Sequence, residues 1–436
     1  MSDYIYMLES RLSPDQNQAA AEVQAAAGQA GVNLFLTGGA MRDMLGGFQI
    51  RDLDFVVEGN ALKVAKAVSE SAKARQVSVD DTRKSAELRF PSGVTTQIAM
   101  AREEKYTRAG AKPQVTAATI QEDLRSRDFT CNAMALSLNK SSRGLLLDPL
   151  NGLADIERRE LRIAAAYGFY DDPARLLSIV RFRARLGFTI EERTAMQMVN
   201  AREAEVEKLI PARTLGEELK RIAVEDNPAA IVEAFGEARL WGLFSPALAG
   251  PKLNMAGVAR LERNLPTLPG GPHWRAARLG PFLYAFAEKL TPKEQLALAK
   301  AVDLGRSDVD LWKKLPSRAK KLETALRPAR ALKASQIYPI VAAAPPDEVL
   351  FLLCHSELKP VRERLRSHFQ KYVPIVQEIT PEEWAALEGK PGTPRHEKAR
   401  EALITERLDR RPRKAPAEEP PPAPPVVDTA AGRRPR

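Results

Sequence analysis

The chain has 436 residues, of which 44% are hydrophobic, so it is long enough for two or three domains with sizeable cores. It contains no run of about 18 apolar residues, which argues against a membrane span, and the acidic, broken start MSDYIYMLESRLS does not resemble a signal peptide. The net charge of +10 indicates a polyanionic partner. Cys131 and Cys354 are isolated and the four histidines form no metal motif, so we expect buried thiols in a reducing cytoplasm and no transition-metal chemistry.

A candidate phosphate-binding turn lies near the N-terminus. Residues 14–30 are rich in Ala and Gln and predict a helix, after which LFLTGGAMRD reads as an apolar strand from Leu34, a glycine turn and a second helix. Gly38 and Gly39 would let a polyphosphate approach the backbone, and the helix N-terminus adds partial positive charge. Arg42 supplies a planar cation one turn later.

The next segment, FQIRDLDFVV, carries the most informative pair of residues. It alternates like a strand, with Leu53, Phe55 and Val57 on one face. Asp52 and Asp54 therefore project from the opposite face, where two carboxylates can bind the same divalent cations. Taken alone, such a pair is most often part of a surface turn. Its place directly after a glycine turn and an arginine favours the layout of a polymerase-type nucleotidyltransferase.

Mixed strands and helices are predicted as far as about residue 150. The patterns give a helix over 61–74 and strands at 75–81, 85–93 and 95–101. Together with the two earlier strands, they predict a sheet with helices packed on it.

The segment IQEDLRSRDFTCNAMALSL follows these strands. Asp123 and Arg125 are expected in a turn, and the apolar residues from Phe129 to Leu136 have helical spacing. Polar groups then lie near the start of this predicted helix, and they form a donor–acceptor set that suits ribose hydroxyls: Arg127, Asp128 and Asn132. A helix cap with a surface ion pair is the alternative explanation of the same residues.

After Asn151 the strand signal fades and amphipathic helices dominate to about residue 380. Asp172 and Arg175 stand three apart at a helix start, so they would be neighbours. A carboxylate acceptor beside a guanidinium donor can match the Watson–Crick edge of a base, whereas an i,i+3 salt bridge is the structural alternative. The same helix carries arginines that would form a basic stripe toward triphosphate or RNA, or else be solvated charges: Arg181, Arg183 and Arg185.

Several motifs occur together in the order typical of one family. They are GGAMRD with DLD, RSRDFTCNA, DPLNGLADIERRELRI and DDPARLLSIVRF, with RTLGEELKRI as a weaker fifth match. AREEKY also fits the family's RxExY pattern at Arg102, Glu104 and Tyr106. The chain resembles, over about residues 30–245, the class II CCA-adding enzymes of the tRNA nucleotidyltransferase and poly(A) polymerase family.

This resemblance implies an α+β fold with a nucleotidyltransferase head that contains a mixed β-sheet, followed by all-helical neck, body and tail domains. We therefore expect a catalytic head at 1–150, a neck for base recognition at 151–225, and a body and tail that bind tRNA at 226–390. Residues 391–436 lose apolar periodicity and are predicted to be a disordered Pro- and Arg-rich tail.

The resemblance also implies a mechanism. The chain would add C and A from CTP and ATP to the tRNA acceptor end with Mg²⁺ and without a nucleic-acid template. Two metal ions about 4 Å apart can activate the tRNA 3′-hydroxyl and stabilise the departing pyrophosphate. The implied roles are metal binding and catalysis for Asp52 and Asp54, triphosphate binding for Gly39 and Arg42, ribose recognition for Arg127 and Asp128, and base recognition for Asp172 and Arg175.

Three positions depart from the family pattern. Gln97 stands where the family usually has an acidic residue on the strand before RxExY, which would weaken metal affinity. Ser126 replaces the first of two arginines, and Ser178 replaces an arginine one turn after Arg175. Both serines lower the positive charge expected around the nucleotide.

Other functions fit parts of the pattern. Bacterial poly(A) polymerases carry a GRRFRL-like segment after the DxD strand, which DDTRKSAELRFPSG does not match well. Enzymes that add only CC or only A differ in a loop before RSRD and stay possible. An inactive RNA-binding relative would explain Gln97 and the two serines, but retention of Asp52 and Asp54 argues against it. The sequence gives no indication of the oligomeric state.

Overall fold

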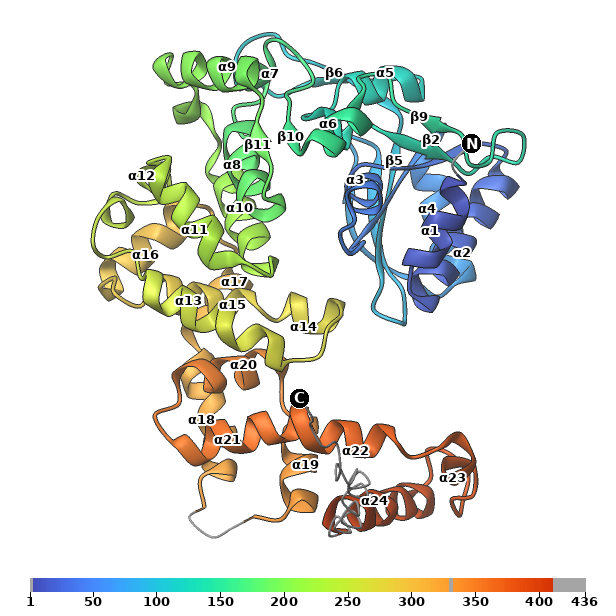
Figure 1. The fold of residues 1–436 in the computed structure, drawn as a ribbon, viewed down its shortest axis with the longest axis vertical. Helices are drawn as coiled ribbons and strands as arrows, with labels where there is room; N and C mark the ends of the chain where they lie inside the picture. Colours follow the sequence, from blue (N-terminus) through green and yellow to red (C-terminus); the bar gives the residue numbers. More distant parts are fainter. Residues whose placement is uncertain (1–2, 329–331, 411–436) are drawn as a thin grey trace, which may run out of the picture.

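A mixed sheet forms the centre of the head. The computed structural model describes residues 3–328 and 332–410, and within them seven strands take the order β3-β4-β5-β2-β1-β8-β9 (Figure 1). β2 and β5 run parallel, and the other neighbouring pairs run antiparallel. The strands are β1 (Asn33–Thr37), β2 (Leu53–Glu58), β3 (Arg75–Asp80), β4 (Ser85–Arg89), β5 (Thr95–Met100), β8 (Ala135–Ser137) and β9 (Leu146–Leu147). The predicted mixed sheet is therefore confirmed.

Apolar residues on both faces of the sheet hold the head helices. Leu34, Leu36 and Phe55 join the large core on the face covered by α2 and α4, whereas Phe35 and Val56 join a smaller cluster with α5 on the other face. A short hairpin of β6 (Arg102–Lys105) and β7 (Gln114–Ala117) extends from the sheet. The head helices are α1 (Tyr4–Arg11), α2 (Pro14–Ala30), α3 (Gly39–Gly46), α4 (Ala61–Ser71) and α5 (Ile120–Arg125).

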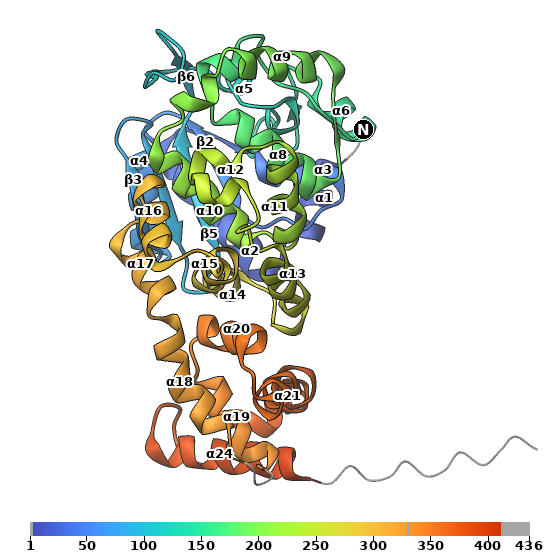
Figure 2. The ribbon, with the colours of Figure 1, turned by 90° about the vertical axis from the view of Figure 1, so that its left-hand side faces the viewer.

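Helices build most of the rest of the described chain, which forms a column beside and below the head (Figures 1 and 2). We call residues 152–224 the neck, 228–313 the body and 315–409 the tail. The neck contains α6 (Gly152–Arg158), β10 (Glu160–Leu161), α7 (Gly168–Asp171), α8 (Arg175–Leu186), β11 (Thr189–Ile190), α9 (Glu192–Glu203) and α10 (Ala212–Val224). The body contains α11 (Pro228–Glu237), α12 (Trp241–Phe244), α13 (Met255–Asn264), α14 (Pro272–Ala276), α15 (Leu279–Ala287), α16 (Pro292–Ala301) and α17 (Arg306–Lys313).

The tail has its own cluster of buried apolar residues, which runs from Leu315 to Leu365. Its helices are α18 (Leu315–Leu326), α19 (Ala334–Ala342), α20 (Pro346–His355), α21 (Lys359–Ser367), α22 (Val373–Gln377), α23 (Pro381–Ala385) and α24 (Pro394–Asp409). No single helix of the described residues is long and apolar enough to cross a membrane. α19 and α20 pass that test only when they are joined across a bend of 119°.

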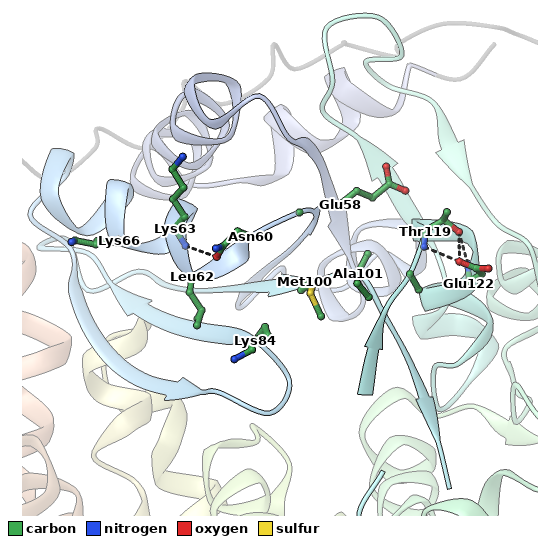
Figure 3. Close-up of a pocket in the computed structure, with 13 residues that line it drawn as sticks. Glu58, Asn60, Leu62, Lys63, Lys66, Lys84, Met100, Ala101, Thr119 and Glu122 are labelled. Atoms are coloured by element: carbon green, nitrogen blue, oxygen red, sulfur yellow. Dashed lines mark hydrogen bonds between the residues drawn. The ribbon is translucent and has the colours of Figure 1, made fainter. Parts of the chain in front are cut away.

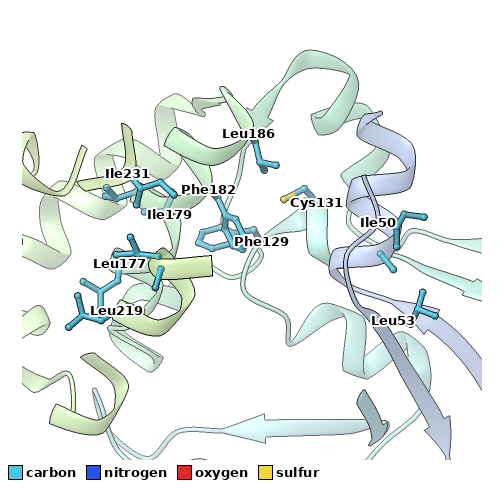
Figure 4. Packing of buried hydrophobic residues seen from close by; sticks show 14 of the residues in the cluster. Ile50, Leu53, Phe129, Cys131, Leu177, Ile179, Phe182, Leu186, Leu219 and Ile231 are labelled. Carbon is cyan, nitrogen blue, oxygen red and sulfur yellow. The ribbon is translucent and has the colours of Figure 1, made fainter. Parts of the chain in front are cut away.

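One continuous core joins the head to the neck. Phe129 from the head packs edge-on against Phe182 of α8, with ring centroids 5.8 Å apart (Figure 4). Leu53 of β2 and Leu177 of α8 belong to the same buried cluster. The position of the neck relative to the catalytic strand is therefore set by close packing.

Three local predictions are wrong. The expected helix around Phe129–Leu136 is a short 3₁₀ turn, Thr130–Asn132, followed by strand β8. Residues 129–138 are all buried, so apolar spacing could not distinguish a helix from a strand there. Asp123 and Arg125 lie in helix α5 rather than in a turn; Thr119 and Glu122 form a capping box at its start.

The third correction concerns the predicted disordered tail. Residues 394–409 form helix α24, although only Leu408 is buried. Thr393 caps this helix, and Asp409 at its end accepts a hydrogen bond from the Ser335 hydroxyl at 2.8 Å. Good helix-forming residues and a docked end therefore hold the helix without apolar periodicity. The remainder of that prediction, residues 411–436, lies outside the described residues.

Candidate active site

Asp52 and Asp54 occupy the start of β2. The strand begins at Leu53, so Asp54 lies within it and Asp52 directly precedes it. Phe55 points into the core below the sheet, whereas Val56 joins the cluster on the opposite face. Because side chains alternate along a strand, Asp54 shares the face of Val56, as the sequence predicted.

The glycine turn lies directly over Asp54. Gly38 has φ 65° and ψ −127°, a conformation that favours glycine. A Cβ atom at Gly38 would lie 3.5 Å from Asp54 Oδ2 and 3.8 Å from Arg127 Nη1, and one at Gly39 would lie 3.8 Å from Asp54 Oδ2. The turn, the arginine and the carboxylate therefore converge, with α3 beginning at Gly39.

The electrostatics of the pair fit a bound cation. Burial, and next the negative charge of Asp52, raise the pKa of Asp54 to about 6, against the opposing charges of Arg127 and Arg42. A divalent cation would relieve this repulsion, and carboxylate oxygens are the ligands that hard cations prefer. Asp52 Oδ1 accepts a hydrogen bond from Thr95 Oγ1 at 3.0 Å, which orients its carboxylate.

Gln97 lies beside this pair. It is the register partner of Asp54 across the parallel β2–β5 pair. Within residues 3–328 and 332–410, no group of three or more His, Cys, Asp or Glu side chains could hold a metal. The two aspartates thus lack the third carboxylate that Gln97 replaces.

Arg42 and Asn132 form a buried chain behind the turn. Arg42 donates from Nε and Nη2 to Asp43 Oδ1 at 2.9 and 2.7 Å and from Nη1 to Asn132 Oδ1 at 2.8 Å. Asn132 Nδ2 in turn donates to Asp128 Oδ1 at 3.0 Å, and the same oxygen accepts from the Phe129 N–H at 2.7 Å. Arg42 is only 3% exposed, so this structure places its charge beneath the turn rather than at the surface.

Arg127 links the turn to α5. Its Nε and Nη2 donate to Asp123 Oδ2 at 2.9 and 2.6 Å, which leaves Nη1 beside Gly38. Asp123 is 2% exposed and also accepts from the Arg102 N–H at 3.2 Å. Asp123, which the sequence placed in a turn, is therefore the residue that fixes Arg127.

Asp172 and Arg175 are close to each other but do not form the salt bridge of the alternative interpretation. Asp172 Oδ1 accepts from the Ala174 N–H at 3.1 Å, and α8 begins only at Arg175. Arg175 is 8% exposed and donates from Nη2 to the Ser126 carbonyl at 3.3 Å, which places it next to Arg127. Most donors of this guanidinium have no partner in the described residues and can meet a ligand.

The RxExY residues form a hydrogen-bonded cluster around Glu104, next to Asp172 and Arg175. Glu104 accepts hydrogen bonds from Arg102 at 2.8 Å, Arg83 at 2.9 Å and the Tyr106 hydroxyl at 3.0 Å. Burial acts to raise the pKa of Glu104, but the hydrogen bonds from Arg83 and Arg102 lower it to about 2. The charges of Asp172 and Arg175 act on Tyr106, so this cluster lies beside the predicted base site.

The predicted basic stripe is wrong. Residues two apart on a helix are separated by about 200°, so Arg183 lies on the opposite side of α8 from Arg181 and Arg185, which are four apart and share one face. Arg181 is 6% exposed and donates to Glu218 at 2.7 Å, and Arg185 donates to Asp43 at 2.9 Å. Arg181 is thus paired with acidic residues and does not form a basic surface; its guanidinium lies 4.6 Å from the centroid of the Phe182 ring, and that of Arg42 lies 5.0 Å from the same centroid.

The sequence interpretation missed a junction centred on two acidic residues between α10 and α11. Glu225 Oε2 accepts from Arg51 Nη1 at 2.5 Å and lies 3.4 Å from Arg185 Nε. Asp226 lies 2.7 Å from Arg51 and 2.9 Å from Arg278. The only feature of the sequence that could have pointed to this junction is that Arg51 stands directly before Asp52. Its partners are far away in the sequence, so no local pattern could reveal them.

A large cavity lies away from this site. A cavity of about 940 Å³ opens at the far end of β2, where Glu58, Lys63, Lys84 and Glu122 are among its lining residues (Figure 3). None of the predicted site residues lines it. Four residues along a strand correspond to about 13 Å, so this cavity is separate from Asp54.

The region that contains these residues is similar to known proteins. The pattern of the poly A polymerase head domain family matches residues 34–162. The chain is 36% identical over 47% of its length to an A-adding tRNA nucleotidyltransferase of Aquifex aeolicus (strain VF5), of which it covers 25%. It is 30% identical over 69% of its length to a multifunctional CCA protein of Stenotrophomonas maltophilia (strain K279a), of which it covers 70%. The chain belongs to the class II CCA-adding enzyme family.

The fold extends this family relationship beyond the head. A solved CCA-adding enzyme in its apo form II superposes with a TM-score of 0.54 at 26% identity, with 95% of this chain and 96% of that chain covered. The family consists of metal-dependent nucleotidyltransferases. The chain spans only a quarter of the length of the Aquifex relative.

Proposed function

We propose that this protein is a tRNA nucleotidyltransferase that adds C and A from CTP and ATP to the tRNA 3′ end without a nucleic-acid template and releases pyrophosphate. One observation carries the proposal. The aspartate pair, the glycine turn and Arg127 converge on one point, and Arg175 is held beside them at the Ser126 carbonyl. Metal, phosphate and base sites are therefore contiguous.

Asp52 and Asp54 would hold Mg²⁺, because two neighbouring negative carboxylates favour a divalent cation between them. When bound, this ion would supply electrostatic stabilisation of the transferred phosphoryl group. The chain's own residues do the positioning. The Gly38–Gly39 backbone and the start of α3 receive the triphosphate, and Arg127 faces it from the other side of the turn.

Base selection is assigned to the pair at the start of the neck. Arg175 offers guanidinium donors and Asp172 offers carboxylate acceptors, and neither is satisfied by the other. The core between Phe129 and Phe182 fixes the neck against the head, so both groups keep a constant position relative to the aspartates. A fixed donor–acceptor edge selects bases as a template strand would.

Addition of A alone is the second candidate, and the name of the Aquifex relative favours it. That relative is the more similar of the two described above, and it is an A-adding enzyme. The relative of which this chain covers more is a multifunctional CCA protein. The free thiols of Cys131 and Cys354 fit a reducing compartment, so we place either activity in the cytoplasm.

The test is a nucleotide-addition assay with the purified full chain. Labelled CTP or ATP is supplied with tRNA that lacks CCA, tRNA that ends in CC and tRNA that ends in CCA. Full CCA addition predicts C incorporation into the first and A incorporation into the second. Incorporation of A into CC-ended tRNA alone would establish the A-adding activity. Long A tracts would instead establish a poly(A) polymerase, and no incorporation into any substrate would refute the proposal.

A further inference from the structure

The body carries an arginine that no part of the catalytic site described so far uses. Arg275 lies on α14, at the end of the body nearest to the head (Figure 1). Neighbouring residues fix α14 from both sides. The Trp274 ring packs edge-on against Phe369 of the tail at 5.3 Å, and Arg278 donates to the Val224 and Glu225 carbonyls at 3.1 and 3.0 Å. The backbone of Arg275 is therefore held rigidly.

The side chain of Arg275 is poorly satisfied. Asp226 lies 2.7 Å from Arg51 and 2.9 Å from Arg278, but 3.8 Å from Arg275, which is thus the most distant of three cations around one carboxylate. Arg275 Nε is buried and has no hydrogen-bond partner. Because this guanidinium competes for a shared carboxylate and its side chain is 19% exposed, it is available to another anion.

The ion pairs around Arg275 show which anion site it lies near. Burial, and next the positive charge of Arg51, lower the pKa of Arg275, whereas the carboxylate of Asp52 acts to raise it. Asp226, which lies 3.8 Å from Arg275, is paired at 2.7 Å with Arg51, the residue directly before Asp52, so the guanidinium lies near the exposed metal-binding aspartate. A phosphate group bound there would relieve the repulsion from Arg51 and Arg278.

The two aspartates then have different neighbours. Arg127 and the glycine turn lie on the Asp54 side, where the proposed function places the triphosphate. In phosphoryl transfer the attacking and leaving oxygens are roughly in line, so the two substrates approach from opposite sides. The side of Asp52 is left for the RNA.

We propose that Arg275 binds a backbone phosphate of the RNA 3′ end and holds it beside Asp52. This inference rests on the proposed function, since it assumes an RNA acceptor. According to this inference, Arg275 of the body makes one charge-assisted contact with a phosphate near the RNA 3′ end that reacts.

The test compares Arg275→Gln with the wild type on tRNA that ends in CC, with ATP as second substrate. We expect the KM for RNA to rise roughly tenfold while the KM for ATP and the half-saturating Mg²⁺ concentration stay unchanged. The slope of log binding constant against log salt should fall by about 0.7 to 0.9, the contribution of one phosphate.

Two variants control for charge and folding. Arg263→Gln removes an exposed arginine on α13 that makes no hydrogen bond or ion pair within the described residues, and it should leave the KM for RNA unchanged. Arg275→Lys keeps the positive charge but cannot donate two parallel hydrogen bonds to one phosphate. Its KM for RNA should therefore lie between those of the wild type and Arg275→Gln. If Arg275→Gln lowers the melting temperature markedly, Arg275→Lys becomes the deciding variant.

Specific outcomes would overturn the inference. An unchanged KM for RNA, or an equal effect of Arg263→Gln, would show that Arg275 makes no specific contact. A rise in the KM for ATP instead would assign it to the triphosphate. If the wild type extends no RNA, the proposed function is refuted independently of this inference. Equilibrium binding of tRNA to the wild type and to Arg275→Gln then still shows whether Arg275 contacts a phosphate.

Discussion

Asp52 and Asp54 are two residues apart on one strand, yet they face different parts of the molecule. The Asp54 side is built by the head: the glycine turn at Gly38 and the fork of Arg127 on Asp123. The Asp52 side is built across domains. There Arg51 binds the Glu225–Asp226 junction, which Arg278 of the body also binds.

The difference indicates a division of labour. The head side is made of contacts within one domain, so its shape should be independent of how the body sits. The junction side depends on three regions, so it responds to their relative position. Nucleotide binding should therefore be robust to changes in the junction, whereas RNA binding and overall stability should not.

The largest effect is expected from removal of either aspartate. Asp52→Ala or Asp54→Ala should abolish nucleotide addition and leave tRNA binding nearly intact, because both carboxylates are assigned to the metal. Single-turnover addition to CC-ended tRNA measures the first effect, and filter binding of the same RNA measures the second. Addition above a few per cent of wild type by both variants would refute the metal assignment.

A smaller, side-specific effect is expected at Arg175. Its replacement by Ala leaves a base edge unpaired, which costs about 1–3 kcal/mol, or about one to two orders of magnitude in rate. The loss should appear as weaker preference for CTP and ATP over UTP and GTP, with KM for RNA unchanged. Wild-type nucleotide preference in the variant would show that the Arg175 contact to Ser126 is only structural.

The junction should dominate stability rather than nucleotide choice. Glu225 is 3% exposed and faces Arg51, Arg181 and Arg185, so Glu225→Gln leaves buried positive charge uncompensated. Loss of one partner of a buried pair costs about 3–5 kcal/mol, which denaturant unfolding would measure.

An exposed pair provides the matched control for that measurement. Glu237 and Arg183 lie 3.6 Å apart with side chains 60% and 52% exposed. Glu237→Gln should therefore cost less than about 1 kcal/mol. Equal losses in the two variants would mean that the junction is no more important to folding than a surface pair.

The raised pKa of Asp54 predicts a pH-dependent effect in metal-free buffer. Its pKa is about 6 in the folded protein against a reference of 3.8, so the folded state binds the proton more tightly. Stability is then lost as pH rises from about 4 through 6. Asp54→Asn carries no charge and should gain melting temperature relative to wild type at pH 7.5 but little at pH 5. The same difference at both pH values would contradict the raised pKa.

The smallest effect is expected at Gln97. Gln97→Glu adds a carboxylate opposite Asp54 in the parallel register, so half-saturation by Mg²⁺ should occur at a lower concentration. Initial rates on CC-ended tRNA across a Mg²⁺ titration measure it. An unchanged or higher half-saturating concentration would show that Gln97 does not limit metal binding.

The sequence by itself determined the parts of this protein that are encoded locally. Alternation placed Asp54 opposite Phe55, and glycine chemistry placed a turn at Gly38, because strand period and backbone freedom depend on adjacent residues. The same reasoning failed around Thr130–Asn132. There every residue is buried, so the apolar pattern carried no period that could separate a 3₁₀ turn and strand from a helix.

Only the tertiary structure determined which charged residues pair with one another. The arginines of α8 looked like one basic stripe, but Arg181 is buried against Glu218 and Arg185 against Asp43. Arg51 meets an acidic residue more than 170 positions away, and Arg275 of the body lies 3.8 Å from Asp226, which Arg51 also binds. Which charges meet depends on how packed domains are oriented, and that orientation is set by long-range contacts such as Phe129 on Phe182.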